Sequence, residues 1–517
     1  MTTSTQKNTV PNETIPCGTL PPLEYRDLPA PIALRKMLGP SIILAGLALG
    51  SGEFVLWPYV TYKVGFVFFW ACILGVTTQY FLNMEITRWS LATGESAITG
   101  FVRLSRHWAW VFLLLNVLPW MIPAWAKGAA QIISWMIWGP ILDNSGALVG
   151  TYYATPLAIG GMIFCGLILT AGPVLYDTIE RIQIILVSSV MLLVVIMAVW
   201  LVSGRLDAVT SQVTALFTFG APQFIPPFDT DLTPVLLLGA LAFAGAGGTT
   251  NLGQSNYIKD KGYGMGRYIG RITSPITGQK EAIAEVGYHF PPTDKNLQRW
   301  RAWWRAASIE HFLSFFCTCL LCLILLTLIS YAIFFDSNGQ RIDDAAKFAN
   351  GIGFVWGEAV LLEDRLGGAA QLISPKFLFL VMGIAILLTT EFGVLDVASR
   401  ISTDVVKVTW LRENKYWSEG RLYYLFLWGT IFLGSSILLL ETLDINVGAF
   451  GLFKLSAAMN GCVMFLYSGL LLYINRWRLP EYVRARGWRV AILIWAVGFF
   501  GFFACWAGYT TLRQLFS

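Results

Sequence analysis

Near the middle of its first apolar run, the chain reads Leu47-Ala48-Leu49-Gly50-Ser51-Gly52-Glu53-Phe54. The run extends from about Leu38 to about Val60, and about 20 residues of α-helix are enough to cross a bilayer. Glycine weakens a helix by ~1 kcal/mol relative to alanine, and a charge at the bilayer centre costs ~2.5 kcal/mol or more. Irregular backbone is tolerated at that depth only where it lines a cavity or lies buried in protein. These residues therefore predict a binding site inside a membrane domain.

The composition is that of a polytopic membrane protein. Of the 517 residues, 56% are hydrophobic and only 13% are charged, which excludes an ordinary soluble domain. The net charge of +5 is spread over several loops, so nucleic-acid binding is not expected. Most of the eight cysteines fall in apolar runs, where a thiol acts as a small hydrophobe. No Walker loop, catalytic Ser/His/Asp order or metalloenzyme spacing occurs, so we expect neither an enzyme nor a bound cofactor.

Eleven apolar runs are long enough to span a membrane. They cover 38–62, 66–89, 108–138, 153–171, 179–203, 233–258, 307–335, 375–400, 421–440, 447–474 and 488–512. Lysine and arginine collect in every second loop, which places those loops and the N-terminus in the cytoplasm and the C-terminus outside. We expect the protein to lie in the plasma (inner) membrane. The predicted order is a cytoplasmic tail (1–37), helices 1–5 (38–203), an external loop (204–232), helices 6–10 (233–475) with a cytoplasmic loop (259–305) and an external loop (336–374), and helix 11 with the C-terminus (476–517).

The sixth run is interrupted like the first. It contains Gly245-Ala246-Gly247-Gly248-Thr249-Thr250-Asn251-Leu252-Gly253, which has four glycines in nine residues. Close packing of helices explains glycines in one span, but it does not explain glycine-rich interruptions at matching positions of two spans. Interrupted spans in corresponding places of two halves indicate an inverted-repeat secondary transporter whose substrate site lies between them. The predicted fold is an all-α polytopic membrane protein with a 5+5 inverted repeat, broken helices 1 and 6, and one extra helix.

Charged side chains inside the spans are candidates for coupling. Glu53 is interpreted as a cation ligand, a proton carrier or one half of a buried ion pair. Lys127 can pair with Glu53 or Glu391, or release a proton, and Glu391 lies deep in the eighth span. Asp396 and Arg400, spaced i and i+4, are interpreted as a pair on the helix surface. All three histidines are placed in or beside cytoplasmic loops: His107, His289 and His311.

The order of spans, with breaks in the first and sixth, resembles the leucine-transporter fold of the amino acid–polyamine–organocation superfamily. Within it, the chain is most similar to the Nramp divalent-metal transporters. The similarity extends through Tyr80–Gly94, Ile179-Glu180-Arg181 and the eleven-span count. This resemblance implies a proton-coupled symporter that takes up a divalent metal by alternating access.

The breaks themselves depart from the Nramp pattern. Nramp sites use Asp-Pro-Gly-Asn in the first span and Met-Pro-His in the sixth, whereas this chain has Gly50-Ser51-Gly52-Glu53 and Gly247-Gly248-Thr249-Thr250-Asn251. Without thioether and imidazole, the remaining oxygen donors suit hard cations such as Mg²⁺ or Mn²⁺. The first break also resembles the Gly-Ser-Gly-Ile-Phe segment of amino acid transporters, whose glycine backbone cradles a carboxylate. A proton- or sodium-coupled transporter of an amino acid or small organic acid is therefore the alternative.

The predicted site combines both breaks. Its substrate-binding residues are Gly50, Ser51, Gly52, Glu53, Gly247, Gly248, Thr249, Thr250 and Asn251. Glu53 and Asn251 are the predicted metal ligands, and Glu53, Lys127 and Glu391 are the predicted groups for proton or ion coupling. The expected partners are a small inorganic or organic substrate, H⁺ or another coupling ion, and the lipid bilayer.

Overall fold

The structure is a computed structural model that describes residues 15–33, 37–172, 175–220, 232–272, 286–366, 374–443, 445 and 448–516. The longer stretches outside this description are 1–14 and 34–36 of the predicted tail, 221–231, 273–285 and 367–373. The described residues form a helical bundle with two short strand pairs. β1 (Glu24–Tyr25) pairs in parallel with β4 (Tyr288–His289), and β2 (Ile141–Leu142) pairs antiparallel with β3 (Leu148–Gly150). The predicted all-α class is confirmed.

The helices of the first half cover the five predicted runs, and two further short helices, Ala97–Leu104 and Leu206–Phe217, lie outside these runs. They are α1 (Pro40–Ala48), η2 (Leu49–Leu56), α2 (Trp57–Val64), α3 (Phe69–Thr93), α4 (Ala97–Leu104), α5 (His107–Trp120), α6 (Ala124–Trp138), α7 (Ala154–Ala171), α8 (Leu175–Val202) and α9 (Leu206–Phe217).

The second half begins with two short helices in place of one span. Its elements are α10 (Pro234–Ala242), α11 (Gly248–Lys261), η3 (Gly264–Tyr268), α12 (Asp294–His311), η4 (Phe312–Cys317), α13 (Thr318–Phe334), η5 (Asp343–Phe348), α14 (Gly353–Leu366), α15 (Pro375–Thr409), α16 (Glu419–Leu439), η6 (Leu440–Leu443), α17 (Ala449–Tyr473), η7 (Ile474–Arg478) and α18 (Trp488–Phe516).

Nine helices within the described ranges are long and apolar enough to cross a membrane. The second and sixth predicted spans are not among them. α3 has 25 residues but carries polar side chains such as Gln79, Asn83 and Glu85, and the sixth span is divided between α10 and α11. The count of eleven therefore stays a prediction.

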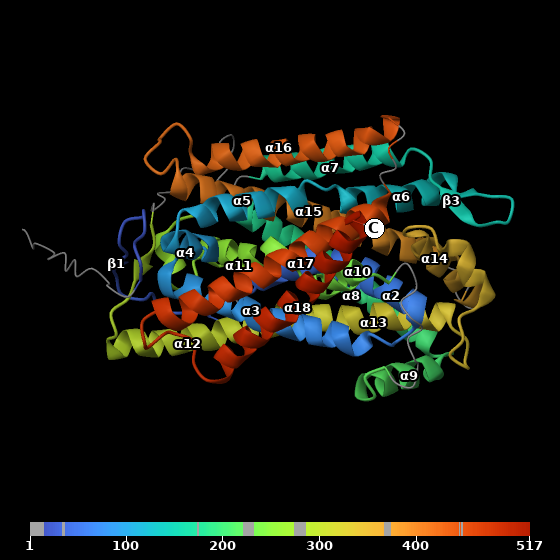
Figure 1. Cartoon of the computed structure of the whole chain (residues 1–517), viewed down its shortest axis with the longest axis horizontal. Coiled ribbons are helices and arrows are strands. Elements are labelled where there is room, and N and C mark those ends of the chain that lie inside the picture. Colours follow the sequence, from blue (N-terminus) through green and yellow to red (C-terminus); the bar gives the residue numbers. More distant parts are fainter. Residues whose placement is uncertain are drawn as a thin grey trace, which may run out of the picture.

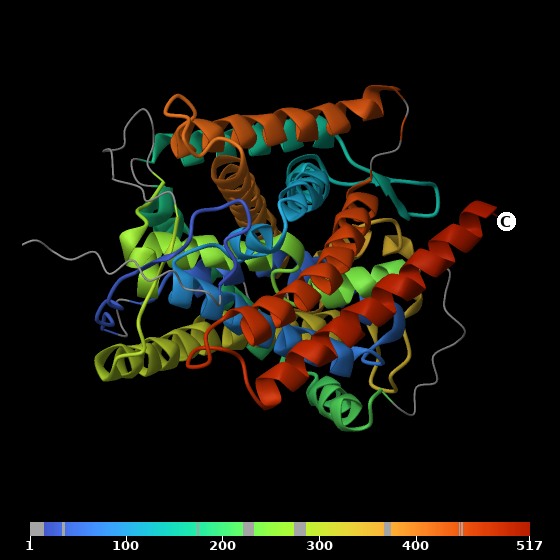
Figure 2. The same cartoon turned by 60° about the vertical axis from the view of Figure 1, so that its left-hand side comes forward.

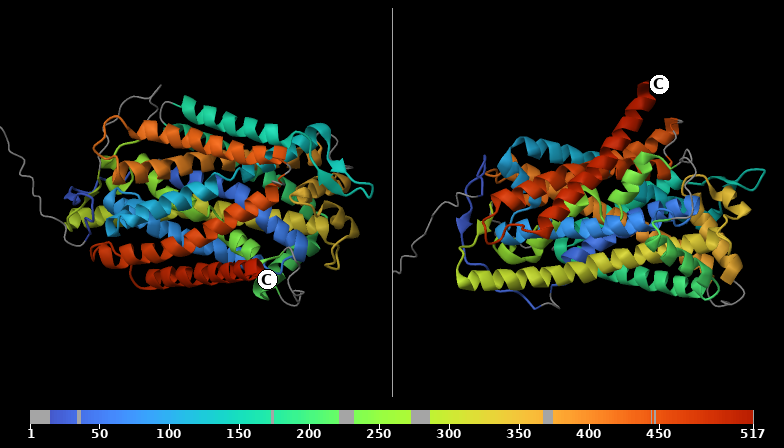
Figure 3. Two further views of the ribbon diagram at one scale, coloured as in Figure 1. Left: turned by 45° about the horizontal axis from the view of Figure 1, so that its top comes forward. Right: turned by 60° about the horizontal axis from the view of Figure 1, so that its bottom comes forward.

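The long helices run roughly side by side along one axis of the molecule (Figure 1). α7 and α16 lie together along one edge, whereas α12 and α13 follow each other as one rod along the opposite edge (Figure 3). α18 packs against α17 and carries the C-terminus out of the bundle (Figure 2). The segments predicted to be cytoplasmic, β1 and the start of α12, lie at one end, and the β2–β3 hairpin and α14 lie at the other.

The two interrupted spans differ in form. The first stays helical from Pro40 to Val64 but widens into the π-helix η2, which contains both glycines of the break and Glu53. π-Helical turns are rare and frequently occur at functional sites. The sixth span is interrupted outright, and Gly245, Gly247 and Gly248 between its halves have positive φ angles of 130°, 75° and 54°. Such angles favour glycine because it has no Cβ.

A third interruption was not predicted from the sequence. The span at 107–138 consists of α5 and α6, which are separated at Met121–Pro123. Pro119 and Pro123 flank this break, and proline removes a backbone donor and clashes with the preceding turn. These two prolines are the sequence feature from which the break could have been predicted.

Asp396 and Arg400 do not form a surface pair, so that prediction was wrong. Both side chains are fully buried, and Arg400 Nε donates to Asp396 at 2.9 and 2.8 Å. Arg400 also forms an ion pair with Asp260 of α11, and Tyr257 and Tyr423 donate to Asp396, each at 2.8 Å. The i, i+4 spacing along α15 predicted the ion pair. The packing of α11 and α16 on that helix buries it.

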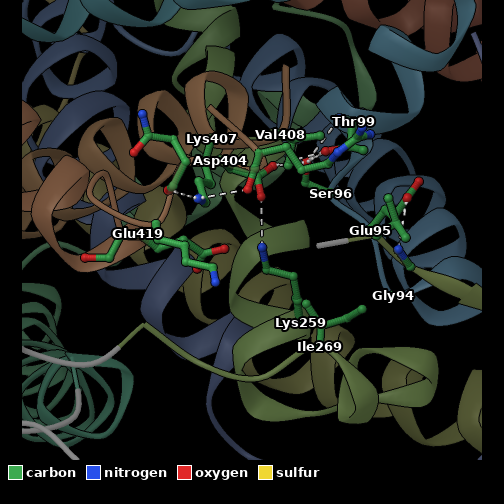
Figure 4. Close-up of a pocket in the computed structure, with 16 residues that line it drawn as sticks. Gly94, Glu95, Ser96, Thr99, Lys259, Ile269, Asp404, Lys407, Val408 and Glu419 are labelled. Atoms are coloured by element: carbon green, nitrogen blue, oxygen red, sulfur yellow. Dashed lines mark hydrogen bonds and ion pairs between the residues drawn. The ribbon is translucent and has the colours of Figure 1, made fainter. Parts of the chain in front are cut away.

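A second buried ion pair joins α11 to α15 at the same end. Lys259 donates to Asp404 at 2.8 Å, and Ser96 at the start of α4 donates to the same carboxylate at 2.5 Å. These residues border a cavity of about 280 Å³ (Figure 4). The second half of the sixth span is therefore fixed to α15 by two ion pairs in this conformation.

Candidate substrate site at the helix breaks

Gln79 of α3 holds the two halves of the sixth span together. Its Oε1 accepts from the backbone N–H of Gly247 at 3.1 Å and from Nδ2 of Asn251 at 3.2 Å. Its Nε2 donates to carbonyls at the end of the first half, those of Leu241 (3.3 Å), Ala242 (2.7 Å) and Ala244 (2.9 Å). One buried amide thus satisfies backbone groups that the break leaves without helical partners.

The first and sixth spans touch at glycines. A Cβ on Gly52 would overlap the backbone carbonyl of Phe243, and a Cβ on Gly248 would overlap Oδ1 of Asn460. Gly50 also packs closely on Thr390 of α15 and donates its N–H to the Thr390 hydroxyl at 3.0 Å. The structure therefore brings both predicted breaks to the same place.

Gly52→Ala is expected to reduce both stability and transport, because the neighbouring atom is backbone and cannot turn away. Overpacking a tight contact costs about 1–3 kcal/mol, and more where backbone must move. The melting temperature of the purified variant and its uptake in proteoliposomes measure the effect. Gly498→Ala is the control, since a Cβ added at that glycine would have no other atom within 4 Å. Wild-type values for Gly52→Ala would contradict the close crossing.

Glu53 lies fully buried between these spans. Neither carboxylate oxygen has a hydrogen bond of normal geometry to a described residue, although the backbone N–H of Gly245 and the thiol of Cys319 lie nearby. The thiols of Cys72 and Cys322 are buried within electrostatic range of this carboxylate. A buried carboxylate without a partner is costly unless a cation or a proton neutralises it.

Two asparagines present unpartnered oxygens beside the break. Asn251 uses its Nδ2 to reach Gln79 and the Tyr467 hydroxyl at 3.0 Å, and no described residue forms a hydrogen bond with its buried Oδ1. Asn460 of α17 donates its Nδ2 to the carbonyl of Ser456 at 3.0 Å, and its Oδ1, next to Gly248, has no partner among the described residues. The sequence predicted Asn251 but not Asn460 as a site residue.

The two threonines of the sixth span use their hydroxyls elsewhere in this conformation. Thr249 accepts from Nε1 of Trp120 at 2.6 Å and donates to Oδ1 of Asn116 at 2.8 Å. Thr250 donates to carbonyls of its own helix, those of Ala246 and Gly247. Ser51 lies in η2, and its side chain is outside the described part.

Neither of the other coupling candidates touches Glu53. Glu391 is buried and accepts from the N–H of Ala126 at 3.3 Å, at the start of α6, where a helix N-terminus favours a negative charge. Lys127 pairs with Glu441 at 2.6 Å and donates to Thr155 at 2.8 Å. This ion pair borders a cavity of about 770 Å³ at the end of the molecule with α14. Lys127 therefore pairs with neither Glu53 nor Glu391.

No family model matches the sequence, and no curated protein matches it. Solved structures do: a variant of the manganese transporter of Eremococcus coleocola is 12% identical, with a TM-score of 0.62 over 93% of this chain and 88% of that chain. The same transporter in complex with an aromatic bis-isothiourea substituted compound is 12% identical, with a TM-score of 0.58 over 96% and 90%. The chain is an integral membrane protein with the fold of that transporter, the leucine-transporter fold.

Proposed function

We propose that this protein is an Nramp-like secondary active transporter that takes up a hard divalent cation, Mg²⁺ or Mn²⁺, together with protons by alternating access. The buried and unpartnered carboxylate of Glu53 carries the proposal. It lies at the crossing of two interrupted spans, where transporters of this architecture bind substrate. A divalent cation or a proton would each offset the cost of burying that charge.

The unpartnered oxygens of Asn251 and Asn460 support a cation over an anion. Both amide nitrogens are turned away into hydrogen bonds, so the groups left beside the break are acceptors. Carboxylate and amide oxygens are ligands that Mg²⁺ and Mn²⁺ prefer. The pairing of Lys127 with Glu441 gives further support, because it directs that ammonium group to another carboxylate.

A transporter of an amino acid or small organic acid is the second candidate. The glycine backbone from Gly245 to Gly248 supports it, since N–H groups at the start of α11 suit a carboxylate. This candidate gives Glu53 a different role, as the partner of an ammonium group on the substrate.

Thermal-shift measurements separate the two candidates. Addition of Mg²⁺ or Mn²⁺ is expected to raise the melting temperature, with a stabilisation of about 2.7 kcal/mol at about 100-fold excess over Kd. Amino acids and organic acids are expected to have no effect, and Glu53→Gln should remove the metal response. Cd²⁺ belongs in the series because the thiol of Cys319 lies near Glu53 and two further buried thiols are within electrostatic range of it. Stabilisation by organic ligands, with no response to any metal, would overturn the proposal.

We propose an orientation with the N-terminus in the cytoplasm, the C-terminus outside and the protein in the plasma (inner) membrane. The distribution of lysine and arginine over the loops supports it. So does the gathering of β1 and the start of α12 at one end of the bundle, opposite α14 (Figure 1).

A further inference from the structure

Four buried polar side chains form a connected row behind the sixth-span break. Nε2 of Gln254 lies 3.2 Å from Nδ1 of His311, and the same ring nitrogen lies 2.9 Å from the Ser41 hydroxyl. Ser41 in turn donates to Oε2 of Glu310 at 2.5 Å, while its backbone N–H donates to Oε1 at 3.2 Å. The row joins α11, the end of α12 and the start of α1.

His311, which the sequence placed in or beside a cytoplasmic loop, is the last residue of α12, and its side chain lies inside the bundle. The imidazole is 1% exposed and stacks between Tyr80, at 5.4 Å, and Phe315, at 4.8 Å between ring centroids. α12 continues past the expected loop and joins α13 through the π-helix η4, so His311 is carried into the bundle. Its Nε2 has no hydrogen-bond partner among the described residues.

We propose that His311, Ser41 and Glu310 form a proton relay from the substrate site to the cytoplasmic end, an inference that rests on the proposed function. A proton that reaches Nδ1 of the neutral Nε2–H ring of His311 replaces the hydrogen bond from Gln254 and gives an imidazolium whose Nδ1–H donates to Ser41 Oγ. The Ser41 hydroxyl proton passes to Glu310 as the Nδ1 proton passes to Ser41. His311 returns to the neutral Nε2–H form and Glu310 becomes a carboxylic acid, so one proton has moved and charge is conserved.

The inner end of the row is tied to the substrate site. Gln254 lies one turn beyond Asn251 on α11, and Asn251 is held by Gln79 at the break. The Gln254 amide N–H can donate only to an unprotonated Nδ1, so protonation of His311 forces this side chain to turn. The protonation state of His311 thereby affects a side chain of α11, the second half of the sixth span.

The outer end of the row, Glu310, has neighbours that border a cavity on the side predicted to be cytoplasmic. Tyr176 and Lys261 are titratable neighbours of Glu310, and both border a cavity of about 390 Å³. Lys261 pairs with Glu180 of α8 at 2.6 Å. The titratable groups that face the row from its packing elements are Tyr80 of α3, Tyr176 and Glu180 of α8, Lys261 of α11, Tyr263 before η3, and Cys317 of η4.

The alternative is a purely structural role, in which Glu310 holds the N-terminus of α1 in place through its hydrogen bonds with Ser41. The two roles differ in what happens when hydrogen bonding is kept but the proton cannot be carried. Glu310→Gln provides that condition, because an amide replaces the carboxyl group without a titrating proton. Ser41→Ala removes the connecting hydroxyl.

Proteoliposomes with a trapped pH indicator test the relay, with Mn²⁺ as the substrate probe. Glu310→Gln and Ser41→Ala are each expected to lower proton flux and pH-driven uptake by about 100-fold. Mn²⁺ counterflow, which requires no net proton release, should stay near the wild-type rate. Glu358→Gln and Ser468→Ala are matched controls, because each removes a buried carboxyl or hydroxyl group outside the row. Wild-type proton flux in Glu310→Gln would overturn the relay.

A spectroscopic measurement tests the protonation of Glu310, and its link to Ser41, without any transport assay. The infrared difference spectrum of the detergent-solubilised protein between acid and neutral pH should contain a carboxylic-acid C=O band that Glu310→Gln removes and Ser41→Ala shifts. The Glu358→Gln spectrum should keep that band. Absence of uptake in the wild type would defeat the proposed function, whereas a band unaffected by both row variants would defeat the relay.

Discussion

Glu53→Gln is expected to reduce uptake to background while the protein stays folded. The substitution keeps the shape of the side chain and removes a buried carboxylate at the crossing of the two interrupted spans. Because neither carboxylate oxygen has a hydrogen-bond partner in the described part of the chain, its removal strands no buried cation. The melting temperature should therefore be equal to or above that of the wild type.

A double-mutant cycle with Lys127→Met sharpens this prediction. Lys127 pairs with Glu441, whose side chain is 30% exposed, so the effects of the two substitutions on stability should add within about 0.5 kcal/mol. Melting temperatures and uptake of both single variants and the double variant are the required measurements. Residual uptake in Glu53→Gln, or a coupling energy well above that limit, would contradict the site as described.

Arg400→Met is expected to cause the largest loss of stability. It leaves the carboxylates of Asp396 and Asp260 buried without their common cation. Removing one partner of a buried ion pair costs about 3–5 kcal/mol, and here two carboxylates lose the same guanidinium. The two tyrosine hydroxyls that donate to Asp396 offset part of this cost but carry no charge.

Chemical denaturation or the melting temperature of purified protein measures this loss. Arg486→Met is the matched control, because its side chain is 56% exposed in its ion pair with Glu481, and exposed pairs contribute about 0–1 kcal/mol. An Arg400→Met variant as stable as Arg486→Met would show that the α11–α15 junction does not depend on this cluster.

The sequence by itself determined the helical class, the positions of most spans and the break in the sixth. Apolar runs set how much chain lies in the bilayer, and clustered glycines remove helix propensity wherever the chain packs. Glu53 followed from the same reasoning, since a carboxylate in an apolar run needs a local explanation. The prolines at 119 and 123 carry a similar local signal for the third break, because proline lacks the backbone N–H that continues a helix.

Only the tertiary structure decided which buried groups meet. Hydropathy reports that a residue lies within a span, but not which neighbour its side of the helix faces. Lys127 therefore could not be assigned to Glu441, more than 300 residues away along the chain, and Asp396 and Arg400 looked like a surface pair. His311 is buried because the rod of α12 and α13 continues past the predicted loop. Ion pairs and hydrogen bonds depend on helix packing, which no local pattern encodes.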